Sequence, residues 1–357
     1  MDVTDFSELP RIVTPLLAWY RGTARVLPWR SDPKPYHVWL SEIMLQQTRV
    51  EAVKGYYHRF LQKLPTIAAL AEADEEVLLK LWEGLGYYNR VRNLQKAAQV
   101  VVKEYGGELP ADYEALLKLP GIGRYTAGAI SSIAFGLPCP AVDGNVLRVI
   151  ARVTANEENT SKEPVKRNFE SALAASMPQN DASAFNQALM ELGATVCLPN
   201  GAPRCEACPL SHICKAHQLG NELAFPLKDQ KPARRIEQRT VFVVLSENRV
   251  GIQKRPPKGL LRGLWEFPSA EGKLDRDAAI CYLKTIGLTA HNLVPLGDAK
   301  HIFTHLEWQM TGFAVECTPC SDCALTWVTL QQLREEYSLP GALKAYTAAL
   351  GSLLSEK

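Results

Sequence analysis

The hydrophobic pattern of the chain changes its period once, and this change determines the class of fold. In stretches such as DEEVLLKLWEGLG (74–86) and RNLQKAAQVVVKEYGG (92–107), apolar residues recur every three or four positions and glycine ends the run. This spacing is typical of amphipathic helices. From residue 239, RTVFVVLSENRVGIQKRP predicts two strands joined by a Glu-Asn turn. We therefore expect an all-α domain followed by a smaller α+β domain.

A stretch rich in proline and basic residues, GNELAFPLKDQKPARRIEQ (220–238), separates the two patterns as a linker would. A chain of 357 residues is long enough for two domains. We predict a helical domain over 1–217, a linker over 218–238 and a second domain over 239–357. Within the second domain the pattern predicts a helix near 275–286, strands near 301–317 and 325–329, and closing helices.

The composition is that of a folded soluble protein, with 46% hydrophobic and 22% charged residues. No apolar run approaches the length of a membrane span, and the first residues, MDVTDFSELPRIV, carry acids where a signal peptide carries bases. We expect a cytosolic protein with no membrane partner. In that compartment the nine cysteines are expected to be metal ligands or buried thiols rather than disulfides.

The segment DYEALLKLPGIGRYTAGAISSIAFG (112–136) predicts two short helices joined by a tight turn. Pro120 blocks continuation of the first helix, and Gly121 and Gly123 permit close approach of the backbone. The turn leaves backbone N–H groups at the start of the second helix, where they can bind a phosphate oxygen. An ordinary helical hairpin fits equally well when the segment is taken by itself.

Two carboxylates stand in contexts that suit catalysis. Asp143, in AVDGNVLRVIARV, precedes a predicted helix, so its simplest role is that of an N-cap. Glu42, in YHVWLSEIMLQQTRV, shares a helix face with Val38 and Leu45 and has no Lys or Arg three or four residues away. A carboxyl in such surroundings should have a raised pKa, which suits a general acid at neutral pH.

The hairpin followed by VDGN resembles the helix-hairpin-helix base-excision glycosylases, and WLSEIMLQQT resembles the signature of MutY-type adenine DNA glycosylases. The resemblance implies a DNA glycosylase that flips out and excises adenine paired with 8-oxoguanine or guanine and leaves an abasic site. It implies that Glu42 protonates adenine N7, that Asp143 stabilises the oxocarbenium ion, and that Tyr125 and Asn145 support them through hydrogen bonds. The related endonuclease III family has a lysine at the position of Tyr125. A phenol cannot form the Schiff base that an amine forms, so this chain should be monofunctional.

The same resemblance assigns residues that contact DNA and the excised base. It implies that Gln47, the second glutamine of LQQT, and Tyr87, the first tyrosine of GLGYYNR (84–90), wedge into the duplex. An aromatic ring can replace the base stacking that is lost when a base flips out. Without the resemblance, core packing would be the better interpretation of that tyrosine. The residues expected on DNA are Gln46, Gln47, Thr48, Tyr87, Gly121 and Gly123. Those expected to line an adenine pocket are Arg25, Trp29, Arg30 and Gln187.

Four cysteines lie close together in CLPNGAPRCEACPLSHIC, with the spacing C-x7-C-x2-C-x5-C. Such a set can bind zinc or a [4Fe–4S] cluster, and spacing does not choose between them. The family resemblance implies a [4Fe–4S] cluster, although the family usually has six residues in the first gap. The expected ligands are Cys197, Cys205, Cys208 and Cys214. We expect no second metal site at Cys317, Cys320 and Cys323, because they are only three thiols with no nearby histidine.

The C-terminal region resembles the Nudix (MutT-like) fold through GLLRGLWEFP (259–268). A working Nudix hydrolase needs a glutamate-rich helix to hold magnesium, and LDRDAAICYLKTIGL (274–288) lacks those glutamates. The resemblance implies that this domain instead recognises 8-oxoguanine with the loop HIFTH, which contains Phe303, Thr304 and His305. The family commonly has serine at the position of Thr304. Threonine keeps the hydroxyl that can bond to the N7–H and O8 of the oxidised base, and an ordinary strand end with Phe303 in the core also fits the loop.

Three other functions are compatible with parts of the sequence. A bifunctional pyrimidine glycosylase is disfavoured by Tyr125 and by the second domain. A nucleotide hydrolase is disfavoured by the missing glutamates. A non-catalytic DNA-binding module would make Glu42 and Asp143 incidental. The resulting prediction is a monomer of the bacterial cytosol or nucleoid that acts on double-stranded DNA with A:8-oxoguanine or A:G mispairs.

Overall fold

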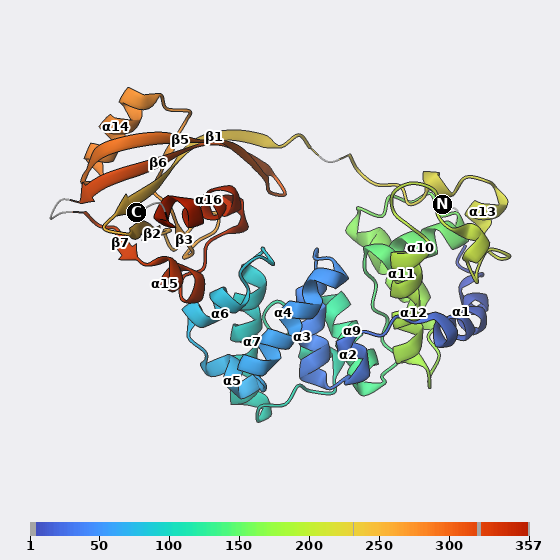
Figure 1. The fold of residues 1–357 in the computed structure, drawn as a ribbon. Helices are drawn as coiled ribbons and strands as arrows, with labels where there is room; N and C mark the ends of the chain where they lie inside the picture. The colour runs from blue at the N-terminus through green and yellow to red at the C-terminus, as the bar shows by residue number, and fades with distance from the viewer. Residues whose placement is uncertain (1–4, 231, 320–322, 356–357) are drawn as a thin grey trace. The chain divides into compact units, whose positions relative to one another are not determined.

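The computed structural model describes residues 5–230, 232–319 and 323–355. The chain forms two compact units (Figure 1). The first comprises Met1–Glu72 and Arg92–Gln230, and the second comprises Ala73–Val91 and Lys231–Lys357. Within the described ranges, no helix is both long and apolar enough to cross a membrane. The segment Ala73–Val91 thus belongs to the unit that holds the C-terminal sheet, although its own pattern is helical.

The first unit is built of helices. The α-helices are α1 (Leu9–Thr23), α2 (Pro28–Ser31), α3 (Pro35–Leu45), α4 (Val50–Lys63), α5 (Ile67–Glu72), α7 (Asn89–Tyr105, whose first turn lies in the second unit), α8 (Tyr113–Leu117), α9 (Arg124–Phe135), α10 (Gly144–Thr154), α11 (Glu163–Ala175), α12 (Ala182–Thr195) and α13 (Lys215–Gln218). Short 3-10 turns lie at Cys205–Ala207 and Glu222–Ala224. Apolar faces of α1, α10 and α12 form one continuous core. Helix α3 packs against α9, and α9 packs against α12.

The predicted hairpin is confirmed as α8 and α9. Gly121 has a φ of +77°, a conformation that favours glycine, and a Cβ there would lie 2.7 Å from Cβ of Asn93. Gly123 is the N-cap of α9 and provides no capping side chain, which leaves the first N–H groups of that helix available. Gly136 ends α9 in a left-handed conformation. The turn therefore depends on two features that the sequence showed: Pro120, which blocks continuation of the first helix, and Gly121, which can adopt a positive φ.

The second unit contains a mixed sheet with strand order β3-β2-β1-β6-β5. Its strands are β1 (Arg235–Ser246), β2 (Arg249–Lys254), β3 (Trp265–Glu266), β4 (Ser269–Glu271), β5 (Leu288–Ile302), β6 (Leu306–Pro319) and β7 (Thr326–Val328). Strands β1 and β6 run parallel, and the other pairs are antiparallel. The predicted turn between β1 and β2 is confirmed, since Glu247 and Asn248 both have positive φ, as a tight hairpin requires.

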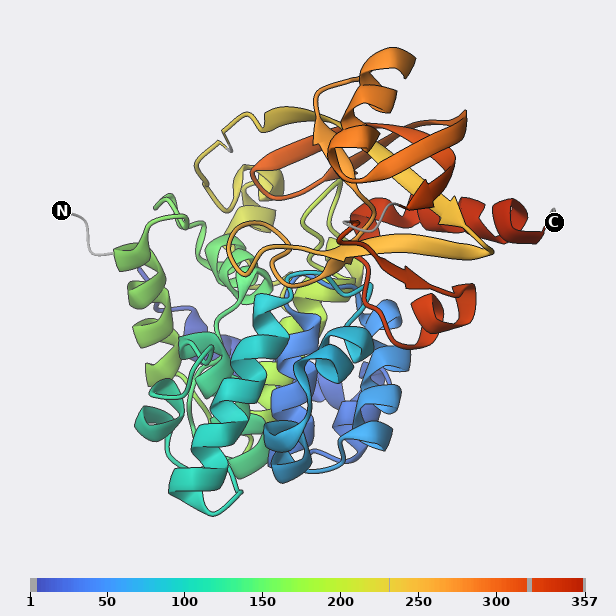
Figure 2. The ribbon, with the colours of Figure 1, turned by 90° about the vertical axis from the view of Figure 1, so that its left-hand side faces the viewer.

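Helices cover both faces of this sheet. The unit contains α6 (Glu75–Leu81), α14 (Arg276–Thr285), α15 (Leu330–Glu335) and α16 (Lys344–Ser355), with a 3-10 turn at Gly341–Leu343. Helix α14 lies on one face and α16 on the other (Figures 1 and 2). Leu283 of α14 belongs to the same core cluster as Phe242 of β1, whereas Tyr346 of α16 belongs to the cluster that contains Val243. The alternation of β1 between two apolar faces is therefore explained by a helix on each side.

Strand β5 corrects the sequence prediction. The pattern predicted a strand beginning near 301, whereas the structure has a 15-residue strand from Leu288 to Ile302 and begins β6 only at Leu306. Strand β5 is an edge strand with register shifts near Pro295 and Gly297. Proline and glycine are tolerated at edges and bulges, where ladder bonds are missing, so such a strand lacks a clear alternating signature.

We predict that Gly121→Ala destabilises the helical unit, because alanine must adopt a left-handed conformation and approach Asn93. The expected loss in free energy of unfolding is ~1–3 kcal/mol. The matched control is Gly22→Ala in α1, where a Cβ meets nothing within 4 Å and alanine favours the helix. Chemical denaturation followed by far-UV circular dichroism measures both, and equal midpoints for the two variants would contradict the assignment.

Candidate active site

The first unit contains a cleft of about 1020 Å³, lined by residues of α2, α3, α9, α10 and α12. The four residues predicted to be catalytic, Glu42, Tyr125, Asp143 and Asn145, all line it. They come from three helices, α3, α9 and α10, that are far apart in the sequence. The predicted DNA and adenine contacts in the same cleft are Gln46, Gln47, Thr48, Arg25, Trp29, Arg30 and Gln187.

Glu42 is a buried carboxyl, only 5% exposed. The pKa of Glu42 is raised to about 7, chiefly by burial and also by the nearby charge of Asp143, while a hydrogen bond from Tyr125 and the charge of Arg30 act in the opposite direction. The direction agrees with the apolar helix face seen in the sequence. At neutral pH a substantial fraction of Glu42 therefore carries a proton that it can donate.

Tyr125 orients this acid. Its hydroxyl donates a hydrogen bond of 2.5 Å to Oε2 of Glu42 and lies 3.7 Å from Sδ of Met190. Burial and the negative charge of Glu42 raise the pKa of Tyr125 well above its usual value. The phenol consequently stays neutral and acts as a donor.

Asp143 is both the N-cap of α10 and a wall of the cleft. Its Oδ1 accepts the backbone N–H groups of Asn145 (2.9 Å) and Val146 (2.8 Å), and its Oδ2 accepts Nδ2 of Asn145 at 2.8 Å. Burial raises the pKa of Asp143, and these hydrogen bonds oppose the rise. The cap is compatible with the predicted catalytic role, because it fixes the carboxylate beside the cleft.

Hydrogen bonds continue from Asp143 toward the cysteine-rich loop. Oδ1 of Asn145 accepts a bond of 2.9 Å from Arg148, and Arg148 also donates to the carbonyls of Gly193 (2.8 Å) and Cys197 (2.9 Å). Arg148 is almost fully buried, so these acceptors replace the water that its guanidinium would otherwise bind. One end of the active site is thus joined to the backbone of the first cysteine.

Arg25 and Arg30 converge on a carboxylate that the sequence interpretation missed, Glu191 of α12. Arg25 bonds both of its oxygens at 2.5 and 2.9 Å, and Arg30 adds a bond of 2.8 Å. Burial by itself would raise the pKa of Glu191, but the hydrogen bonds from the two arginines lower it below its usual value. Glu191 is 1% exposed within the apolar stretch QALMELGA. The sequence signal that could have identified Glu191 is an acidic residue in an apolar helical stretch with no basic residue nearby.

The remaining pocket residues are held by their neighbours. Gln187 accepts a hydrogen bond of 3.2 Å from the hydroxyl of Tyr20. Trp29 is buried and packs edge-on against Tyr57, with ring centres 5.5 Å apart. Helix α3 ends at Leu45, and Gln47 then has a φ of +61°, so the chain turns sharply at the cleft.

Four predicted contact residues, Tyr87, Phe303, Thr304 and His305, lie in the second unit. Tyr87 has a φ of +48° and is 49% exposed, and its hydroxyl lies 3.0 Å from Oγ1 of Thr304. Phe303 packs edge-on against Trp308, at 5.0 Å between ring centres, which places it against the core of this unit. The carbonyl of His305 accepts a bond from the backbone of Arg235. The structure therefore groups Tyr87 with the loop 303–305 and places the other predicted residues in the first unit.

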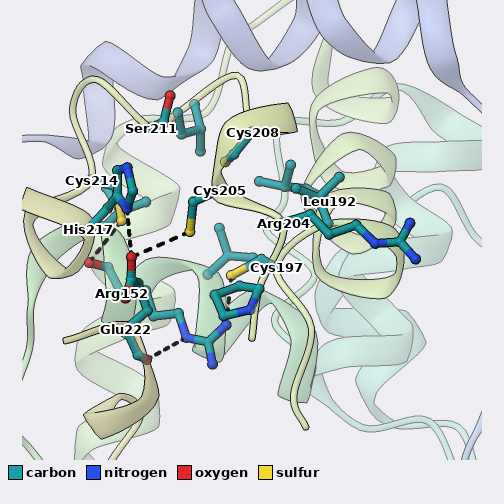
Figure 3. A pocket seen from close by; sticks show the side chains of 15 residues that line it. Arg152, Leu192, Cys197, Arg204, Cys205, Cys208, Ser211, Cys214, His217 and Glu222 are labelled. Atoms are coloured by element: carbon teal, nitrogen blue, oxygen red, sulfur yellow. Dashed lines mark hydrogen bonds and ion pairs between the residues drawn. The ribbon is translucent and has the colours of Figure 1, made fainter. Parts of the chain in front are cut away.

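The four cysteines of the array line one cavity, together with Arg152, His217 and Glu222, which the sequence interpretation did not include (Figure 3). Arg152 donates to Sγ of Cys197 at 3.2 Å, and Cys205 bonds Glu222 at 3.5 Å. None of the four forms a disulfide.

Burial raises the pKa of Cys205 to about 11 and that of Cys208 to about 12. The negative charge of Glu222 adds to the rise at Cys205, and the nearby thiols add to it at both cysteines. Without a metal these thiols stay protonated, whereas a metal would bind the thiolates and release the protons. Four cysteines that line one cavity, with the buried Arg152 beside Cys197, fit a group that needs several thiolates. Among the described residues, the ligand atoms of Cys205, His217 and Glu222 lie within 4.8 Å of one another. Cys317 of the later trio is buried and free, and Cys320 lies outside the described residues.

Comparison with known proteins agrees with this geometry. Residues 40–175 match the family described as HhH-GPD superfamily base excision DNA repair protein, and residues 240–349 match the NUDIX domain. The adenine DNA glycosylase of Rattus norvegicus is 36% identical over 93% of this chain and 76% of its own length. That of Schizosaccharomyces pombe is 32% identical over 96% and 90%. The chain belongs to the adenine DNA glycosylase family.

Solved structures support the same fold. A thermostable thymine-DNA glycosylase is 30% identical, with a TM-score of 0.53 over 60% of this chain and 98% of its own. Endonuclease III trapped as a covalent intermediate with DNA is 25% identical, with a TM-score of 0.52 over 61% and 99%. The predicted family and fold class are therefore confirmed. The chain is a DNA N-glycosylase of base excision repair, which removes the alternative of a non-catalytic binding module.

We predict that Tyr125→Phe raises the pKa of Glu42 above about 7, because it removes the hydrogen bond that lowers this pKa and leaves burial unchanged. The infrared carbonyl band of the protonated Glu42 carboxyl, assigned by its loss in Glu42→Gln, should then persist to higher pH than in the unaltered chain. A band that disappears at the same or a lower pH would show that the 2.5 Å bond does not control this proton.

Proposed function

We propose that this chain excises adenine paired with 8-oxoguanine or guanine from double-stranded DNA and leaves an abasic site. The observation that carries the proposal is a buried Glu42 with a pKa raised to about 7 in the same cleft as Asp143. The relatives are named for adenine, which is a poor leaving group as an anion. Its release therefore requires a proton donor such as a protonated carboxyl. A thymine or oxidised pyrimidine substrate would not use such an acid in the same way.

The proposed chemistry parallels glycoside cleavage. After the adenine has been flipped into the cleft, Glu42 transfers its proton to N7. The bond between C1′ and N9 then breaks, and its electron pair leaves with the base. The negative charge of Asp143 stabilises the cationic sugar, and water adds to C1′. The proton that this water loses restores the acid form of Glu42, so each cycle consumes one water.

The neighbouring residues have supporting roles in this proposal. Tyr125 orients Glu42, and Asn145 holds Asp143 through the 2.8 Å bond. Neither side chain is an amine, so no Schiff base forms and the strand is not cut. Glu191 keeps the two arginines of the pocket in place, and the adenine pocket consists of Arg25, Trp29, Arg30 and Gln187.

For binding DNA, the free N–H groups at Gly121 and Gly123 are proposed to contact a phosphate. Gln47 and Tyr87 are proposed as wedges, and Thr304 as the group that recognises the oxidised base. Gln46, Thr48, Phe303 and His305 complete these contacts. The proposed state is a monomer of the cytosol.

We further propose that Cys197, Cys205, Cys208 and Cys214 bind a [4Fe–4S] cluster. Their common cavity, their lack of disulfides and the hydrogen bond from Arg152 to Cys197 support it. Such a cluster, when bound, cross-links the loop 197–214 through four metal–thiolate bonds. The link from Arg148 to the carbonyl of Cys197 would then fix the end of α10 that carries Asp143.

We predict that Glu42→Gln loses excision activity by at least ~100-fold, because glutamine keeps the shape but cannot donate a proton. Alkali-induced nicking of A:8-oxoguanine and A:G duplexes measures it, and gel-shift affinity for the same duplexes should survive. Glu51→Gln, at an exposed carboxylate of α4, is the matched control. Unaltered turnover by Glu42→Gln would refute the acid role.

The cluster proposal predicts about four irons per chain in protein purified without oxygen. Cys208→Ser should lose iron, whereas Cys281→Ser, at an exposed cysteine of the second unit, should retain it. Elemental analysis measures the iron and zinc content of each protein, and the visible absorption spectrum detects the cluster. Zinc in place of iron would refute the cluster and leave the adenine chemistry intact.

A further inference from the structure

Lys80 of α6 makes an unusual set of contacts within the second unit. Its side chain is 18% exposed, and its ammonium donates to Glu83 at 2.7 Å and to the carbonyls of Leu333 and Tyr337 at 3.2 and 2.9 Å. All three N–H groups of the ammonium thus have acceptors. Residue 333 lies in the last turn of α15, where the helix dipole favours a cation.

The same surface of α6 is held by two further bonds. The second oxygen of Glu83 accepts the backbone N–H of Leu339 at 2.8 Å. Ser338 is fully buried and donates its hydroxyl to the carbonyl of Leu79 at 3.0 Å. Helix α6 and the residues that follow it are therefore attached to the segment 333–339 by one buried and several partly buried polar bonds.

The attachment extends to Tyr87 through a braced turn. Gly84, Gly86 and Tyr87 all have positive φ. Arg90 donates to the carbonyls of Leu85 and Gly86 at 3.0 and 3.1 Å, and its guanidinium lies 5.7 Å from the centre of the Tyr87 ring. These contacts of Arg90 hold the turn and the Tyr87 ring together, so the position of the ring depends on the position of α6.

At the end of this path the Tyr87 hydroxyl meets the Thr304 hydroxyl at 3.0 Å. A threonine hydroxyl has one hydrogen and two lone pairs. If Tyr87 donates, one hydrogen and one lone pair of Thr304 remain. The oxidised base presents one donor (N7–H) and one acceptor (O8), which match that pair, whereas guanine presents acceptors on this edge and no donor for the lone pair of Thr304.

We propose that Lys80 and Glu83 are positioning residues for lesion discrimination. By fixing α6 to segment 333–339 they hold the Tyr87 hydroxyl against Thr304, and the hydroxyl of Thr304 is thereby oriented for 8-oxoguanine. This inference rests on the proposed function, because it concerns the base opposite the excised adenine. Lys80 and Glu83 touch neither base and act only through the tyrosine.

The test measures single-turnover adenine excision by the full chain on A:8-oxoguanine and A:G duplexes. Lys80→Met keeps the length of the side chain but removes its charge, and Tyr87→Phe removes only the exposed hydroxyl. Each should lower the ratio of the two rates by about three- to tenfold, the effect of one hydrogen bond. Lys80→Arg should restore most of the ratio. The matched control is Lys54→Met, which breaks the exposed Lys54–Glu51 pair of α4 and should leave the ratio unchanged.

An unchanged ratio in Tyr87→Phe and Lys80→Met overturns the inference, as does an equal loss of rate on both duplexes, which would indicate a role in folding alone. If Lys80→Met does not fold, Glu83→Gln takes its place, because it keeps the side-chain shape and removes the charge that holds Lys80. Glu83→Gln should lower the ratio, and an unchanged ratio overturns the inference. Failure of the unaltered chain to excise adenine from either duplex would instead refute the proposed function itself.

Discussion

The active site depends on keeping one carboxyl out of water. Glu42 lies on a helix whose face is buried against α9, and that burial raises its pKa to about 7 despite a hydrogen bond from Tyr125. The positive charge of Arg30 in the same cleft also favours the ionised form, whereas the negative charge of Asp143 opposes it. Glu191 binds both Arg25 and Arg30 and so fixes their positions in the cleft. Burial, with the charge of Asp143, outweighs the effects of Tyr125 and Arg30 on the pKa of Glu42.

Burial raises the pKa of Asp143 as well. Three hydrogen bonds at the start of α10 fix Asp143 and oppose this rise, because they favour its ionised form. The two carboxyl groups of the cleft therefore differ in hydrogen bonding, since a bond from Tyr125 lowers the pKa of Glu42, whereas bonds from Asn145 and Val146 lower that of Asp143. The connection through Asn145 and Arg148 to the carbonyl of Cys197 makes the position of Asp143 depend on the cysteine loop.

The sequence predicted those parts of the molecule that short-range signals determine. Pro120 and Gly121 indicated the hairpin, the position of Asp143 indicated a cap, and the apolar face around Glu42 indicated a raised pKa. Glu191 was missed because its partners, Arg25 and Arg30, are distant in the chain. Likewise, nothing local in residues 73–91 indicates that they belong with the C-terminal sheet, since the bonds of Lys80 and Glu83 are made to residues some 250 positions later.

The central claim is that adenine leaves because buried Glu42 donates a proton. The measurement that tests it most directly is the pH dependence of the single-turnover rate of adenine release from an A:8-oxoguanine duplex. Since the raised pKa keeps Glu42 protonated below about 7, the rate should be level there. It should fall about tenfold per pH unit at higher pH as the proton is lost. A rate that stays level or rises up to about pH 9 would contradict the claim.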